Sequence, residues 1–123
     1  MEKDNVSATR QLLAKRRDAH RRALRRELVR LTKAAAEMGV QRVILFGSLL
    51  HGEASLYSDL DLLIIWDTPL SFLERTVELY RRLQPRVATD LLVYTPSEMQ
   101  RMAHTSLVRQ ALREGKVLYE ARC

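Results

Sequence analysis

The sequence of 123 residues has little cysteine and no long apolar run. Its single cysteine, Cys123, is the last residue, which excludes an internal disulfide and a metal site built from several cysteines. No apolar run approaches the roughly 18 residues of a membrane span, and no apolar segment of a secretory signal follows the charged start MEKDNVSATR. We therefore expect a cytoplasmic protein that is not embedded in a membrane.

Two common nucleotide-binding motifs are also absent. The chain has neither the Gly-Lys-Ser/Thr of a P-loop nor the G-x-G-x-x-G of a dinucleotide-binding fold. Its length corresponds to one domain with a single two-layer core. We therefore expect any activity that needs a second domain to recruit that domain from another protein.

The net charge of +6 is unevenly distributed along the chain. Residues 1–38 contain eleven of the 21 Lys and Arg residues and five of the 15 Asp and Glu residues, so this segment accounts for the whole excess. The basic character therefore belongs to one N-terminal element, and the remainder of the protein is neutral.

A long helix is predicted from about Asn5 to Met38. This stretch contains no proline or glycine, is rich in Ala, Leu and Arg, and is followed by Gly39. Apolar residues in its second half recur at steps of three and four and predict a packing stripe: Leu24, Leu28, Leu31, Ala35 and Met38. The same register in the first half meets Arg21, Arg17, Ala14 and Arg10, so we expect that half to project into solvent or against an acidic partner.

The remaining chain alternates strand-like and helix-like segments. Strands are predicted over 40–46, 59–66 and 86–94, a helix over 70–83, one or two short helices over 97–114, and a last strand or return segment over 116–120. In the helix of 70–83, Leu70, Leu73, Val77 and Leu83 have helical spacing. This order predicts an α/β (α+β) fold, with residues 1–38 as a basic interaction element and 39–123 as the folded domain.

Two aspartates begin the second predicted strand. Side chains on a strand alternate between its faces, so Asp59 and Asp61 are expected to point the same way while Leu60 points into the core. Paired carboxylates are hard oxygen ligands that suit Mg²⁺. The alternative is a pair of solvated acids at a strand edge.

A Gly-Ser turn precedes this pair and follows the first predicted strand. Gly47 permits close approach of the backbone to a ligand, and Ser48 opens a short predicted helical segment whose N–H groups suit phosphate oxygens. A tight turn with a capping serine is the alternative.

A third acid, Asp90, lies among apolar residues in VATDLLVY, which we interpret as an interior strand. Burying an unpaired carboxylate is costly, so Asp90 is expected to have a partner there. That partner is either a metal shared with Asp59 and Asp61 or an arginine such as Arg86.

These residues together resemble the DNA polymerase β-like nucleotidyltransferase superfamily, and in particular its minimal nucleotidyltransferase (MNT) group, over about residues 40–120. The resemblance lies in Gly47-Ser48, ten further residues and Asp59-x-Asp61, with Ser58 before the first aspartate, a third acid on a later strand and the ending ALREGKVLY. It implies a small mixed sheet flanked by helices, and an Mg²⁺-dependent transfer of a nucleotide from ATP, with two ions bound.

The resemblance also implies a role for each site residue. Asp59, Asp61 and Asp90 are the implied metal ligands and catalytic residues, and Asp90 helps to deprotonate the acceptor. Gly47, Ser48 and Ser58 are the implied nucleotide-binding residues. Where many relatives have Arg or Lys just before the second glycine of the loop, this chain has His51, which predicts weaker binding of a triphosphate.

MNT proteins of this size are often antitoxins, so the resemblance implies transfer of AMP to a tyrosine of a HEPN-type ribonuclease toxin. The alternative is a non-catalytic module that neutralises a partner protein or holds RNA through the basic helix. Nucleic acid is not favoured because the helix has almost no aromatic residues for base stacking, and a homo-oligomer is compatible with the sequence. His20 and His104 have no metal-ligand partner at a suitable spacing, and we interpret them as surface or capping residues.

Overall fold

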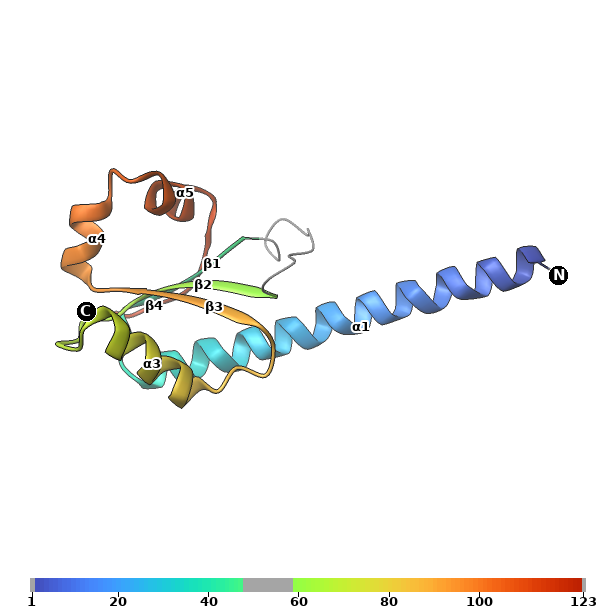
Figure 1. Cartoon of the computed structure of the whole chain (residues 1–123), viewed down its shortest axis with the longest axis horizontal. Coiled ribbons are helices and arrows are strands. Elements are labelled where there is room, and N and C mark those ends of the chain that lie inside the picture. Colours follow the sequence, from blue (N-terminus) through green and yellow to red (C-terminus); the bar gives the residue numbers. More distant parts are fainter. Residues whose placement is uncertain (1, 48–58, 123) are drawn as a thin grey trace.

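The computed structural model describes residues 2–47 and 59–122, with side chains from residue 5 (Figure 1). Its helices are α1 (Glu2–Glu37), α3 (Phe72–Leu83), α4 (Pro96–Met102) and α5 (Ser106–Glu114). Its strands are β1 (Arg42–Phe46), β2 (Leu60–Ile65), β3 (Thr89–Tyr94) and β4 (Lys116–Glu120). These bounds confirm the elements predicted in the described ranges, and they confirm the segment over 116–120 as a strand.

The four strands form one mixed sheet in the order β3-β2-β1-β4. β1 pairs antiparallel with both β2 and β4, whereas β2 and β3 are parallel. The parallel pair requires a crossover connection, which α3 provides. The predicted α/β fold class is confirmed.

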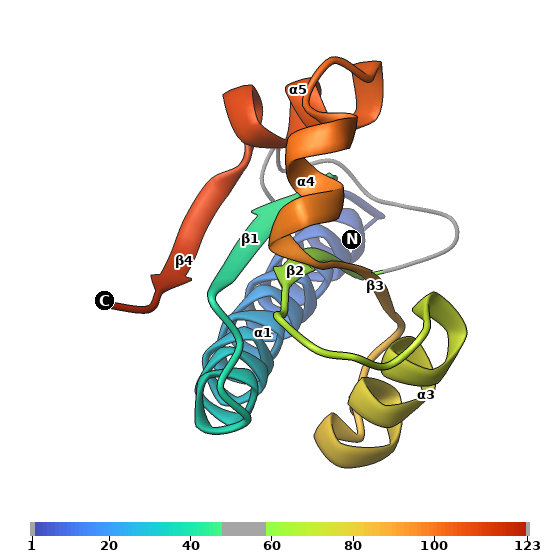
Figure 2. The ribbon, with the colours of Figure 1, turned by 90° about the vertical axis from the view of Figure 1, so that its left-hand side faces the viewer.

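Helices cover both faces of the sheet (Figures 1 and 2). On one face, α1 and α3 pack on side chains of alternate strand residues, including Val43, Leu62 and Val93. On the other face, α4 and α5 pack on the intervening residues, including Ile44 and Leu63. The strands at the centre therefore read as almost continuous apolar runs, because both their faces are buried.

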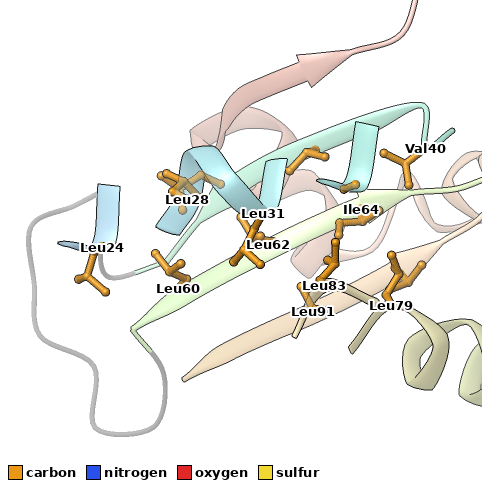
Figure 3. Packing of buried hydrophobic residues seen from close by; sticks show 14 residues of the cluster. Leu24, Leu28, Leu31, Val40, Leu60, Leu62, Ile64, Leu79, Leu83 and Leu91 are labelled. Carbon is orange, nitrogen blue, oxygen red and sulfur yellow. The ribbon is translucent and has the colours of Figure 1, made fainter. Parts of the chain in front are cut away.

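The second half of α1 forms much of the core on its face of the sheet. The predicted stripe is confirmed, since Leu24, Leu28, Leu31 and Ala35 are buried against β2 and its neighbours (Figure 3). The helix ends before Gly39, whose φ of 88° is the left-handed conformation typical of a helix C-terminus. Residues 5–22 are exposed along the projecting half of α1, which we call the basic arm.

The buried face of α3 differs from the spacing noted in the sequence. Leu79 and Leu83 enter the core, but Leu73 and Val77 are 72% and 55% exposed. Arg75 is buried instead, and its guanidinium pairs with Glu98 of α4 at 2.8 Å. Apolar spacing identified the helix correctly but could not tell which of two apolar stripes faces the sheet.

A buried carboxylate holds α1 against the end of α3. Glu27 accepts two hydrogen bonds from Arg30, at 2.6 and 2.9 Å, and a third from the backbone N–H of Arg86. Arg30 also donates to the carbonyls of Leu83 and Gln84, which would otherwise lack helical partners. The hydrogen bond from Arg30 lowers the pKa of Glu27 from its usual 4.5, against an opposing effect of burial.

We expect Glu27→Gln to destabilise the protein by about 2 kcal/mol at pH 7, because it removes a charge-assisted hydrogen-bond network. A lowered pKa in the folded state means that ionised Glu27 stabilises the fold above about pH 4.5, and that this stability is lost as the pH falls through the folded-state pKa. Urea unfolding at pH 7 and pH 3 should show the difference between wild type and variant shrinking at the lower pH. Glu37→Gln, on the exposed side of α1, is the control; a constant difference would contradict this account.

Candidate active site

Two of the predicted acids lie side by side where β2 and β3 begin. Asp61 is the register partner of Asp90 in the parallel pair, and it is also the partner of Phe46 at the end of β1. Adjacent strands lie about 4.8 Å apart, and register partners point to the same face. Asp61 alternates with Leu60 and Leu62, which face α1, so both acids lie on the face of α4 and α5.

Asp59 precedes β2, and its carboxylate lies beside helix α1. Its backbone N–H donates to the carbonyl of Ala88 at 2.8 Å, which fixes the entry to β2. Its Oδ1 lies 3.7 Å from Nε2 of His20, and both side chains remain accessible to solvent. The structure therefore brings Asp61 and Asp90 together in register, and it brings Asp59 next to His20.

His20 is a neighbour of the site that the sequence interpretation missed. The sequence did contain a signal, because His20 lies four residues before Leu24 and thus continues the buried stripe by one helical turn. At that point α1 passes the end of the sheet, so the stripe meets Asp59 instead of the core (Figure 1).

The expectation that Asp90 is buried in an interior strand is wrong. β3 is an edge strand of the sheet, and Asp90 is exposed. Its position needs no buried counter-charge, because solvent reaches the carboxylate from the open side of the strand. Arg86, the alternative partner, donates its backbone N–H to Glu27.

Gly47 allows the backbone to approach the carboxylate of Asp61. Its φ is 81°, and a Cβ placed on it would lie 2.9 Å from Cγ of Asp61 and closer still to Oδ2. The structure thus shows a close approach of Gly47 to the Asp61 side chain, and the predicted approach of Gly47 to a ligand stays a prediction. Ser48, Ser58, His51 and the short helical segment predicted after Gly47 lie outside the described residues.

The donor chemistry of this end of the sheet suits a hard cation. Three carboxylates lie at the starts of two adjacent strands, and Gly47 adds no side chain over Asp61. Within residues 2–47 and 59–122, however, no three His, Cys, Asp or Glu side chains are arranged around one metal position. A shared ion would need the Asp59 carboxylate to turn from His20 toward Asp61.

Comparison with known proteins identifies a family, a relative and a solved structure that resemble this chain. The model of the family described as Polymerase beta, Nucleotidyltransferase matches residues 30–122. A Methanocaldococcus jannaschii protein named as a candidate protein adenylyltransferase is 28% identical over 96 residues, covering 76% of this chain and 93% of that protein. The crystal structure of a candidate nucleotidyltransferase from Sulfolobus solfataricus superposes with a TM-score of 0.58 at 16% identity, over 81% of this chain and 83% of that one.

None of the helices in the described ranges combines the length and the apolar character that crossing a bilayer requires.

We expect Gly47→Ala to destabilise the protein more than Gly39→Ala. Both glycines have positive φ, so each alanine costs about 1–2 kcal/mol in backbone strain. Only at Gly47 would the new methyl group also overlap a side chain, that of Asp61, whereas nothing lies within 4 Å of the Cβ position at Gly39. The overlap should add about 1 kcal/mol or more. Urea unfolding of both variants measures the difference, and equal costs would show that Asp61 moves away freely.

Proposed function

We propose, since this chain belongs to the polymerase beta nucleotidyltransferase family and is a nucleotidyltransferase, that it transfers AMP from ATP to a hydroxyl group of a partner protein. The observation that carries this proposal is the register of Asp61 with Asp90 beside Gly47, at one end of the family-matched sheet. The name of the Methanocaldococcus jannaschii relative supports a protein as the acceptor. A cytoplasmic location suits a reaction that consumes ATP.

In this proposal Asp59, Asp61 and Asp90 hold Mg²⁺, and Gly47, Ser48 and Ser58 hold the nucleotide. When two ions are bound, they stabilise the attacking and leaving oxygens of an in-line displacement. Asp61 is the best-fixed acid of the three, because its strand is paired on both sides and its carboxylate lies against Gly47.

Asp90 serves as the proton acceptor. Its carboxylate is exposed on the edge strand, so a hydroxyl group on a large acceptor reaches it without entering a closed pocket. The hydroxyl proton passes to Asp90 as the oxygen forms a bond to the α-phosphorus. The bond from that phosphorus to the bridging oxygen breaks, and pyrophosphate leaves with the electron pair.

The basic arm is the proposed contact for the acceptor protein. It carries most of the positive charge of residues 1–38, extends away from the folded body, and passes the site at His20 and Asp59 (Figure 1). A HEPN-type toxin with an acidic surface and a tyrosine acceptor would be bound beside the carboxylates and inactivated there. In that role the protein is an antitoxin.

A second candidate function is favoured by the same arm. Its charge and exposure also suit a module that neutralises a partner, or holds RNA, without transferring a nucleotide. The two functions differ in whether the carboxylates are needed.

We expect Asp59→Asn with Asp61→Asn to abolish transfer of label from α-³²P-ATP to protein in a lysate of the source organism with added Mg²⁺. Loss of two carboxylates removes the negative charge that binds the ions. Asp67→Asn, an exposed acid at the far end of β2, should retain full transfer. With γ-³²P-ATP, this protein should transfer no label to its acceptor. Equal labelling by wild type and the double variant would refute the enzymatic proposal and favour the binding module.

We expect Arg10→Glu, Arg17→Glu and Arg21→Glu together to reduce labelling of the acceptor by about tenfold or more at low salt, because they reverse the charge that attracts an acidic partner. ATP binding, measured by calorimetry, should change little. The control is the triple reversal Arg101→Glu, Arg109→Glu and Arg113→Glu, which alters the net charge equally on α4 and α5. Equal losses in both triple variants would show a general effect of net charge and exclude the arm as the docking element.

A further inference from the structure

Tyr80 contacts the backbone on both sides of Asp90. β3 pairs with β2 along one edge only, so the backbone groups of Thr89 and Leu91 point outward from the sheet. The hydroxyl of Tyr80 donates to the carbonyl of Thr89 at 2.7 Å and accepts from the N–H of Leu91 at 3.1 Å. One side-chain oxygen thus takes the place of a neighbouring strand at this residue pair.

Helix α3, which carries Tyr80, is held against the core and against α1. Leu79 and Leu83, on the same stretch of α3, are buried in the core. Arg30 and Glu27 hold the end of the helix against α1. Tyr80 itself remains 37% exposed, while its hydroxyl is bonded to the backbone of β3.

We propose that Tyr80 is a positioning residue for Asp90. Its two hydrogen bonds hold the open edge of β3 so that the Asp90 carboxylate stays in register with Asp61, on the face of α4 and α5. The edge strand that carries Asp90 is thereby held on both sides, by β2 on one side and by Tyr80 on the other. This inference rests on the proposed function, in which Asp90 accepts the proton of the acceptor.

Tyr80→Phe tests the proposal, because it removes the hydroxyl and keeps the ring. Tyr94→Phe removes a hydroxyl from the other end of β3 and is the matched control. The first measurement is amide hydrogen exchange, which needs no activity. In Tyr80→Phe we expect the Leu91 N–H to exchange roughly fivefold to tenfold faster, while amides of the β1–β2 pair keep their wild-type rates.

The second measurement is the steady-state rate of AMP transfer. A displaced Asp90 should lower kcat about tenfold, since the proton acceptor is misplaced. KM for ATP should stay near its wild-type value, because in the proposed function the other two acids still hold Mg²⁺ and the nucleotide-binding residues are unchanged. A general loss of structure would instead change KM, the thermal midpoint and exchange throughout the sheet.

The outcomes distinguish failure of the Tyr80 positioning role from failure of the proposed function. Faster Leu91 exchange together with a lower kcat at unchanged KM supports the positioning role. Unchanged exchange at Leu91, unchanged kcat, or an equal effect of Tyr94→Phe overturns it. If the wild-type protein transfers no nucleotide, the proposed function fails, and the exchange measurement alone decides whether Tyr80 holds the backbone around Asp90.

Discussion

The parallel pairing of β2 with β3 is the constraint on which both the core and the site depend. Its register places Asp61 opposite Asp90, and the same register places Leu62 opposite Leu91. Because side chains alternate along a strand, a slip of one residue would turn the leucines toward α4 and α5 and the acids toward α1. The apolar contacts with α1 make that slip costly. The hydrophobic core therefore determines the face of the sheet on which Asp61 and Asp90 lie.

Helix α1 links the core to the surroundings of the site. Its second half is held by buried leucines and by the Glu27–Arg30 network, so its direction is set by packing on the sheet. A continuous helix transmits that direction to residues outside the body, because its backbone hydrogen bonds leave no hinge. The charged arm and His20 therefore leave the domain at a defined place, beside Asp59. The sequence predicted one long helix, and the structure shows that a single helix carries both the arm and a large part of the core.

Much of the fold could be predicted from sequence because its signals are local. The stop at Gly39, the stripe from Leu24 to Ala35 and the β-branched runs each depend on neighbouring residues. The order of strands in the sheet does not depend on neighbouring residues alone. The apolar surroundings of Asp90 therefore predicted an interior strand, whereas β3 lies at an edge. The same limit applies to Tyr80 and His20, whose partners lie on other elements of the chain. Gly47 predicted a close approach of the backbone to another group, but the sequence did not show that this group is the Asp61 side chain.

An acid on an edge strand has both a benefit and a cost. Asp90 is exposed on this edge strand, which in the proposed reaction would give access to an acceptor too large for a pocket. An edge strand is also less restrained than a central one, and its outward backbone groups invite pairing with other chains. At Asp90 the Tyr80 hydroxyl occupies the two nearest outward groups, which reduces both problems while leaving the carboxylate uncovered. In the proposed reaction, access for a large acceptor and a fixed position of the acid are then compatible. The support reaches β3 through its backbone, and the Asp90 carboxylate stays exposed.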